Sequence, residues 1–287
     1  MQPHIPEARF YPVKSCKPQR LGEGKLVEVT EKGIRGDREF MVTDADGDFK
    51  TQRSRHGEFT RLCLVQPERT EKYLILSAEG MPRIDIPIDP WNREMMDVKI
   101  WDDTVRAMIY AEGSRWMSEF IGKPCRLVRQ DGERKIDRAY APEDAKVSFA
   151  DRNQIHAMSV ETAAAINTEI ERFRPNLLML GLGDRGENNI IRMRIGTAEF
   201  QRTIPCERCE APANAPLTGK FNKDVLELLR EQRKPHASKP PILGEQFLVT
   251  VPGSFRAGDA AEIEILESDA TGNGWSREFE SSPRRKK

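Results

Sequence analysis

Short apolar or alternating runs, interrupted by turn residues, dominate the first ~125 residues of the chain. Runs of this length and pattern are typical of strands. Asp46, Gly47 and Asp48 stand between two of the runs and predict a hairpin turn. Many short strands joined by regular turns favour a barrel or a sandwich. The predicted strands of this half cover residues 25–30, 39–43, 61–66, 73–77, 84–88 and 98–101.

Helical spacing appears at three places along the chain. Residues 114–121 and 223–232 each place apolar side chains on one face of a helix, and a third helix fits 161–172, capped by Ser159 or Val160. The polar stretch 130–146 has no clear period and is expected to be a loop that joins two halves. The chain is therefore predicted to be mostly β with some helix, an α+β protein. The second half adds strands at 177–182, 190–195, 196–204, 246–251 and 261–266.

The overall charge excludes several classes of partner. The formal net charge is +0 with 32% charged residues, so no global field favours nucleic acid or a membrane surface. No apolar run approaches the ~18 residues of a membrane span, and the N-terminus lacks the basic head and apolar stretch of a signal peptide. The five cysteines do not suggest a disulfide framework. We expect a protein of the reducing cytoplasm that binds neither nucleic acid nor membranes.

The segment Cys206-Glu207-Arg208-Cys209 follows a predicted strand and precedes a loop. Its spacing fits a redox dithiol, half of a zinc site, or a thiolate ligand for a soft metal. No second pair of this spacing exists and no histidine pairs with it at zinc-finger spacing, which argues against zinc. His156 lies on an apolar strand and is expected to be a satisfied core residue. The remaining cysteines, at 16, 63 and 125, are expected to be buried small hydrophobes.

Several short motifs, taken in chain order, resemble the MOSC-domain proteins that carry an N-terminal MOSC β-barrel domain, a group that includes the mitochondrial amidoxime reducing component. The resemblance implies a MOSC-type β-barrel domain over 1–128, a MOSC β-barrel domain with peripheral helices over 129–267, and a disordered tail over 268–287. The first motif is expected to be an opening strand followed by an anion-binding turn. The matching segments are 11–16 (YPVKSC), 36–40 (GDREF), 149–151 (FAD), 173–176 (FRPN), 205–209 (PCERC), 218–219 (TG), 244–247 (GEQF) and 252–259 (PGSFRAGD).

The resemblance implies a molybdenum cofactor, a metal held by a molybdopterin whose tail ends in a phosphate. Cys209 falls at the family's catalytic metal-ligand position, and its soft thiolate suits a sulfur-rich metal environment. Arg208 beside it is expected to favour the thiolate. Arg152 and Asn153 replace the small hydroxyl residues common in the family, and Ala215 stands where aspartate is common. The implied cofactor-binding residues are Lys14, Ser15, Arg38, Asp151, Arg152, Asn153, Arg174, Asn176, Glu207 and Arg208.

The function that the resemblance implies is a molybdenum-cofactor oxidoreductase that reduces N-hydroxylated or N-oxide compounds. The cysteines do not have the spacing of an iron–sulfur cluster, so a separate flavin or iron–sulfur protein is expected to donate the electrons. The alternative is a non-catalytic protein that binds the cofactor or carries sulfur on Cys209. A simple thiol-disulfide protein is a third reading, but it leaves the phosphate-binding residues without a role.

Overall fold

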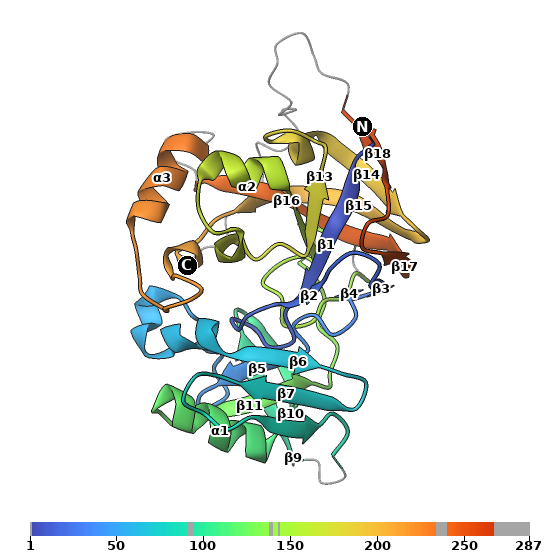
Figure 1. The fold of residues 1–287 in the computed structure, drawn as a ribbon. Coiled ribbons are helices and arrows are strands. Elements are labelled where there is room, and N and C mark those ends of the chain that lie inside the picture. Colours follow the sequence, from blue (N-terminus) through green and yellow to red (C-terminus); the bar gives the residue numbers. More distant parts are fainter. Residues whose placement is uncertain (1, 91–93, 138–139, 143, 234–239, 267–287) are drawn as a thin grey trace.

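The structure is a computed structural model that describes residues 2–90, 94–137, 140–142, 144–233 and 240–266, without the side chains of 54–56 and 58. The predicted mostly-β, α+β class is confirmed (Figure 1). The helices are α1 (Ala111–Ile121), α2 (Val160–Ile166) and α3 (Asp224–Arg233), and the 3-10 turns are η1 (Ser54–Leu64), η2 (Ile170–Phe173), η3 (Gly186–Asn189) and η4 (Ala211–Ala213). The strands are β1 (His4–Phe10), β2 (Gln19–Leu21), β3 (Leu26–Thr30), β4 (Gly33–Ile34), β5 (Phe40–Thr43), β6 (Gln66–Arg69), β7 (Tyr73–Ser77), β8 (Ile84–Pro87), β9 (Glu94–Ile100), β10 (Asp103–Ile109), β11 (Arg126–Gln130), β12 (Ile155–Ser159), β13 (Leu177–Leu180), β14 (Ile190–Ile195), β15 (Ala198–Glu207), β16 (Ile242–Val251), β17 (Gly253–Arg256) and β18 (Ala261–Ile265).

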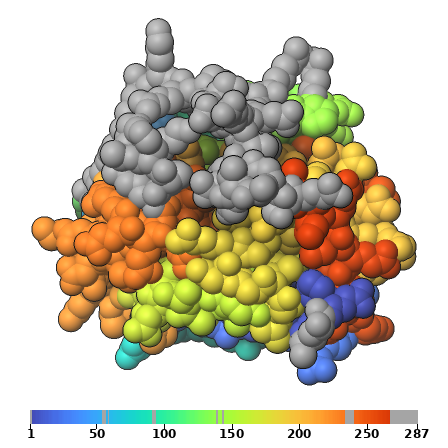
Figure 2. All heavy atoms as spheres, turned by 90° about the horizontal axis from the view of Figure 1, so that it is seen from above, coloured from blue at the N-terminus to red at the C-terminus, as the bar shows by residue number. Residues whose placement is uncertain are grey.

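The largest sheet combines the two ends of the chain. Its strand order is β18-β14-β15-β16-β12-β13-β1-β2, so β1 pairs antiparallel with β13 of the second half. A second link joins β3 to β17. In the view from above, the blue N-terminal residues lie beside the red C-terminal strands (Figure 2). Strand pairing thus crosses the predicted boundary at residue 128, and the first four strands pack with the second half.

The remaining strands form a lower body that contains two sheets and α1 (Figure 1). Their orders are β5-β11-β10-β9 and β6-β7-β8. Phe40, Leu74, Trp116 and Leu127 come from both sheets and from α1, and they belong to one buried cluster. Burial of each such side chain contributes about 1.5–3 kcal/mol. A separate buried cluster packs against the large sheet, and three smaller clusters lie elsewhere in the described residues.

Three segments connect the upper and lower bodies, and the predicted anchoring residues lie on them. The first is the turn between β1 and β2, where Val13 bridges to Phe40 of β5. The second runs from β4 to β5 and carries Arg38. The third runs from β11 to β12 and carries Asp151. The predicted site therefore lies where the two bodies meet.

Three local predictions differ from the structure. Residues 61–64 belong to η1 rather than to a strand, since Phe59 and Leu62 are buried three residues apart, as a 3-10 turn requires. The predicted helix 161–172 ends after Ile166 because Asn167 adopts a left-handed conformation with φ of 54°. The opening strand lies at β1, before the 11–16 motif. The tail predicted for 268–287 lies outside the described residues.

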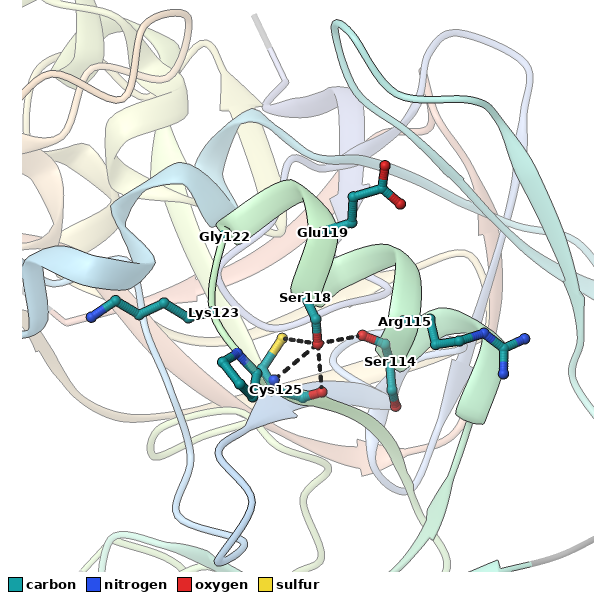
Figure 3. A pocket seen from close by; sticks show the side chains of 8 residues that line it. Ser114, Arg115, Ser118, Glu119, Gly122, Lys123 and Cys125 are labelled. Carbon is teal, nitrogen blue, oxygen red and sulfur yellow. Dashed lines mark hydrogen bonds between the residues drawn. The ribbon is translucent and has the colours of Figure 1, made fainter.

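A shallow hollow lies beside the end of α1, and its polar groups cap that end of the helix. Ser118 Oγ contacts Ser114 O at 2.7 Å, Cys125 O at 3.0 Å and Cys125 Sγ at 3.6 Å, and it accepts the Cys125 N–H at 2.9 Å (Figure 3). Gly122 ends the helix with φ of 80°, a conformation that glycine adopts without strain. Arg115, Glu119 and Lys123 point in different directions (Figure 3). The polar groups of this hollow serve the α1–β11 connection rather than a ligand.

Candidate functional site

The two cysteines of the 206–209 segment have opposite environments. Strand β15 continues through Glu207, and its alternating pattern turns Cys206 into the interior while Glu207 faces outward. Cys209 lies beyond the strand and is exposed, and the Ala211 N–H points at its Sγ at 3.5 Å. The exposed thiol can reach a ligand, whereas the buried one cannot. Cys16, Cys63 and Cys125 are buried, as predicted.

Cys206 is surrounded by hydrogen-bond donors and positive charge. Arg208 donates to its Sγ at 3.0 Å and Gln246 Nε2 lies at 3.5 Å. Burial alone raises the pKa of Cys206, but His156 and Arg208 outweigh burial and lower the pKa to about 5. Arg208 thus stabilises the thiolate of Cys206. With this pKa, Cys206 carries a negative charge at neutral pH.

His156 reaches this thiol because the neighbouring strand carries a glycine. His156 is buried and its Nε2 lies 3.1 Å from Leu243 O, which agrees with the predicted core role. A Cβ at Gly244 would lie 2.3 Å from that ring nitrogen. Gly244 also has φ of 76°, so any other residue would be strained there. The GEQF motif therefore has a physical role in packing His156 beside β16.

Three predicted anchoring residues have left-handed backbones. Ser15, Arg38 and Arg174 have φ values of 71°, 50° and 56°. Positive φ is uncommon outside glycine and costs about 1–3 kcal/mol when it is held by the surrounding structure. Trp101, with φ of 56°, contacts Asp151 of the same site through Nε1 at 3.1 Å. Strained residues thus gather where the sequence predicts the anion-binding turns.

Tyr11 holds two of the predicted cations on its ring. The guanidinium carbon of Arg38 lies 4.5 Å from the ring centroid and that of Arg174 lies 4.1 Å from it. The Tyr11 hydroxyl donates to Pro175 O at 3.2 Å, and burial raises its pKa. Cation–π contacts of this kind orient arginine side chains. Two like charges are therefore held beside one another, which favours an anion between or near them.

Asn176 orients Arg38 through a buried network. Its Oδ1 accepts from Arg38 at 3.0 Å and from the His156 N–H at 3.1 Å. Its Nδ2 donates to Arg9 O at 3.1 Å and to Asp37 Oδ1 at 3.2 Å. Asp37 also accepts from Arg38. Because its amide atoms are engaged with protein groups, Asn176 acts as a positioning residue for Arg38.

Replacing Asn176 with alanine is expected to destabilise the protein by about 2–4 kcal/mol, because several buried groups lose a partner at once. Urea unfolding of the apo-protein measures the change. Asn189→Ala, at an exposed position, serves as the control and is expected to stay within about 0.5 kcal/mol of the wild type. A loss below about 1 kcal/mol at Asn176 would mean that water replaces these bonds.

Lys14 and Asp151 pair across the two bodies. Lys14 Nζ donates to Phe149 O at 2.8 Å and to Asp151 Oδ1 at 2.5 Å. Burial lowers the pKa of Lys14 to about 8 although Asp151 opposes that shift. The charges of Lys14 and Arg53 outweigh burial at Asp151 and hold its pKa well below the usual range. Asp151 is half exposed, so it remains within reach of a ligand.

The two residues that depart from the family pattern are both engaged. Arg152 donates to Glu207 at 3.1 Å and ties the connecting segment to the end of β15. Asn153 Nδ2 donates to Thr203 Oγ1 at 2.8 Å and to Gln246 Oε1 at 2.9 Å. Its Oδ1 is buried and has no partner. Such an acceptor normally finds a donor, so a ligand with an N–H group fits here.

Arg174 differs from the other predicted cations because its charge is not compensated. Lys14 pairs with Asp151 and Arg38 pairs with Asp37. Arg174 donates to the Cys16 carbonyl at 2.6 Å, and across the described ranges no carboxylate forms a salt bridge with it. Burial lowers its pKa. A half-buried cation without a counter-ion is a binding site for an anion.

Hydrogen bonds connect the predicted residues into one site. Arg208 donates to Phe173 O at 2.9 Å, which fixes the cysteine loop against the residue before Arg174. Arg174 in turn donates to the carbonyl of Cys16, next to Ser15.

In the part of the chain that the structure describes, no three His, Cys, Asp or Glu side chains gather as a metal site. Also within those residues, no helix has the length and apolar character to cross a bilayer.

Two family models each match one half of the chain. The MOSC N-terminal beta barrel domain model matches residues 3–124 and the MOSC domain model matches 144–262. Mitochondrial amidoxime reducing component 2 of Rattus norvegicus is 30% identical over 87% of this chain and 80% of its own length. The chain belongs to the MOSC family. Mitochondrial amidoxime-reducing component 1 of Mus musculus is 28% identical over 87% of this MOSC chain and 79% of its own length.

A molybdenum cofactor sulfurase of Bos taurus is also similar to this MOSC protein. It is 26% identical over 78% of the chain, but the match spans 28% of the sulfurase.

Three residues of the site were not predicted from the sequence: Tyr11, Asp37 and Trp101. Tyr11 and Asp37 belong to the 11–16 and 36–40 motifs, so they could have been predicted from their nearness to Lys14 and Arg38 in the sequence. Trp101 had no such signal, because its contact with Asp151 depends on the folding of the third connecting segment.

Proposed function

We propose that this MOSC protein binds the molybdenum cofactor and reduces N-hydroxylated or N-oxide compounds with electrons from a separate flavin or iron–sulfur protein. The uncompensated charge of Arg174 carries the proposal, because a buried cation without a counter-ion calls for an anionic group such as the cofactor's phosphate. The similarity to amidoxime reducing components supports the substrate class. The cytoplasmic location remains a prediction, and several relatives are named as mitochondrial.

The donor set of the site fits this cofactor. The exposed thiol of Cys209 would be the protein ligand to the metal. Arg174 would bind the phosphate, with Arg38 held beside it on Tyr11. The unpartnered Oδ1 of Asn153 would accept from a pterin N–H. When bound, the cofactor supplies the two-electron chemistry that removes an oxygen atom from nitrogen.

The protein's own residues divide the remaining work. Lys14 and Asp151 form a charged pair that joins the two bodies beside the site. Asn176 and Asp37 hold Arg38, while Arg152 and Glu207 hold the end of β15. Rigid supports of this kind are what a cofactor enzyme needs to orient the reacting group. Removal of oxygen as water consumes two protons and two electrons, and the electrons come from the partner protein.

Removing the Arg174 side chain is expected to lower cofactor affinity by about 1.5–3 kcal/mol, since a charge-assisted contact is lost. The melting temperature of the apo-protein is expected to fall less than in Arg38→Ala, because Arg174 loses a hydrogen bond and a ring contact but no salt bridge. Arg38→Ala is expected to lower apo stability by about 3–5 kcal/mol, because it strips Asp37 of its buried partner. Pterin released per chain and thermal unfolding measure the two effects.

Arg83→Ala, at an exposed surface pair, is the matched control and should change neither quantity. Arg174→Ala protein with unchanged pterin content but lower activity would assign Arg174 to the substrate instead. The assay that separates enzyme from carrier uses loaded wild-type protein, reduced viologen dye and a simple amidoxime. Dye oxidation supports the reductase, whereas amidoxime binding without dye oxidation favours a cofactor or sulfur carrier.

A further inference from the structure

A cavity of about 490 Å³ lies between the two bodies, next to the predicted cofactor site. We call it the Asn214 cavity. Its lining includes Arg174, so the cavity adjoins the residue assigned to the cofactor's phosphate. It also includes Asn214, Pro216 and Leu217 from the loop that follows Cys209. Two segments far apart in sequence thus close one space, and one of them is the loop that follows the candidate metal ligand.

Asn214 places an unused hydrogen-bond acceptor in the wall of this cavity. Its side chain is 3% exposed, and Nδ2 donates to the backbone carbonyl of Gln52. A carbonyl only accepts, so the amide atom that faces Gln52 must be the NH₂ group. The other atom is therefore the oxygen, and this buried Oδ1 has no partner. Because Asn214 lines the cavity, a ligand there that carries an N–H or O–H group would supply the donor that this oxygen lacks.

The charges around the cavity leave one cation without an assigned partner. Glu169 accepts from Arg172 at 2.6 Å, and Glu171 pairs with Arg20. Both carboxylates are thus compensated by arginine. Lys17 also lines the cavity, and no side-chain hydrogen bond or salt bridge of its ammonium group occurs among the residues with described positions. With Arg174 assigned to the cofactor, Lys17 is available for an acidic group.

The loop that carries Asn214 has an apolar side. Ala215 and Pro216 are apolar, and Leu217 is 78% exposed beside Pro216. Gln52 and Cys63, from the first half, also line the cavity and contact this loop through Asn214 and the Ala215 carbonyl. The cavity therefore offers an acceptor near the Cys209 loop, an apolar wall and a cation on the first half. These three kinds of group together fit a ligand that carries a hydrogen-bond donor, a flat apolar part and an acid.

We propose that the Asn214 cavity binds the substrate and selects N-hydroxylated bases that carry an acidic group. This inference rests on the proposed function. Asn214 accepts a hydrogen bond from the nitrogen end of the substrate, which lies toward the Cys209 loop. Lys17 binds the acid, and Pro216 and Leu217 cover the flat middle. Lys17 and Asn214 are then the specificity-determining residues of this chain.

Two probes that differ in one group test the selection. Loaded wild-type protein with reduced viologen dye is expected to reduce 4-carboxybenzamidoxime about tenfold more efficiently than benzamidoxime, measured as kcat/KM. Lys17→Gln is expected to raise KM for 4-carboxybenzamidoxime about tenfold and so to remove this preference. Lys25→Gln, in an exposed turn outside the cavity lining, should keep the preference. Asn214→Leu is expected to raise KM for both probes alike.

Calorimetry on the Cys209→Ser protein separates this inference from the proposed function. In this protein, Lys17→Gln is expected to weaken binding of 4-carboxybenzamidoxime about tenfold. That result supports substrate binding in the Asn214 cavity even if loaded wild-type protein reduces nothing. Equal reduction of both probes, unchanged by Lys17→Gln, overturns the selection while leaving the reductase intact. Melting curves of each variant confirm that the protein is folded.

Discussion

Replacing Cys209 with serine is expected to lower reduction of an N-hydroxylated substrate by more than about a hundredfold, since even residues that only support a ligand cost 10–100-fold. Cys209 is the exposed thiol at the end of β15, and a serine hydroxyl is a poor ligand for a soft metal. The effect should appear in turnover with viologen dye, normalised to bound pterin. Thermal stability should remain close to that of the wild type, because the side chain is exposed.

Cys125→Ala is the matched control for this experiment, because its thiol is buried beside α1 and away from the site. It should retain turnover per bound pterin. If Cys209→Ser and Cys206→Ser lost activity equally and completely, a dithiol mechanism would replace the single-ligand proposal. If Cys209→Ser kept most of its activity, the metal-ligand assignment would be wrong.

Much of the fold could be predicted because its strands carry local patterns. Residues 73–77 and 190–195 alternate or run apolar between turn residues, and the structure has strands at those bounds. The pairing of β1 with β13 could not be predicted in this way, because it joins residues more than 160 apart along the chain. Register between distant strands depends on the whole core, which no local pattern specifies.

The positions of the turns in the site could be predicted from the sequence, but the contacts between its side chains could not. Ser15, Arg38 and Arg174 all have left-handed backbones, and each stands in a motif that contains proline or glycine, although only Arg174 is directly next to one. The sequence could not show that Asp37 and Asp151 neutralise Arg38 and Lys14 while Arg174 stays uncompensated. That distinction depends on which side chains meet when the two bodies pack.

The partner of Arg208 illustrates the same limit. Arg208 and Cys209 both lie beyond the last residue of β15, and their nearness in sequence does not decide which groups they contact. Arg208 instead donates to Cys206, two residues back and inside the sheet. The consequence is a charged thiol in the core, beside His156 and Gln246. Its charge can be tested through stability alone, without cofactor.

The Cys206 thiolate is expected to make stability rise with pH. The folded pKa of Cys206 is about 5 and the ordinary value is 9.0. Between these values the unfolded chain binds a proton that the folded protein does not, so the free energy of unfolding increases by about 1.4 kcal/mol per pH unit. The contribution is complete above pH 9 and is lost as the pH falls toward 5.

Glu245 acts in the opposite direction over much of this range. Burial raises its pKa to about 8 although Arg202 opposes the shift, so its contribution to stability is complete below 4.5 and is lost as the pH rises toward 8. In the wild type the pH dependences that Cys206 and Glu245 give to the free energy of unfolding nearly cancel. A single pH profile would therefore not reveal the thiolate. A comparison between two variants removes most of the Glu245 contribution, because both variants keep that residue and the Cys206 charge has only a small influence on its pKa.

The comparison uses Cys209→Ser protein and the Cys206→Ser/Cys209→Ser double variant, so that the exposed thiol does not titrate. Urea unfolding from pH 6 to 8 under reducing conditions should give curves whose slopes differ by about 1.4 kcal/mol per pH unit, with the double variant losing stability as the pH rises. Serine keeps an acceptor for Arg208, so the hydrogen bond is preserved while the charge is removed. Parallel curves would mean that Cys206 is a neutral thiol and that Arg208 is held by the Phe173 carbonyl alone.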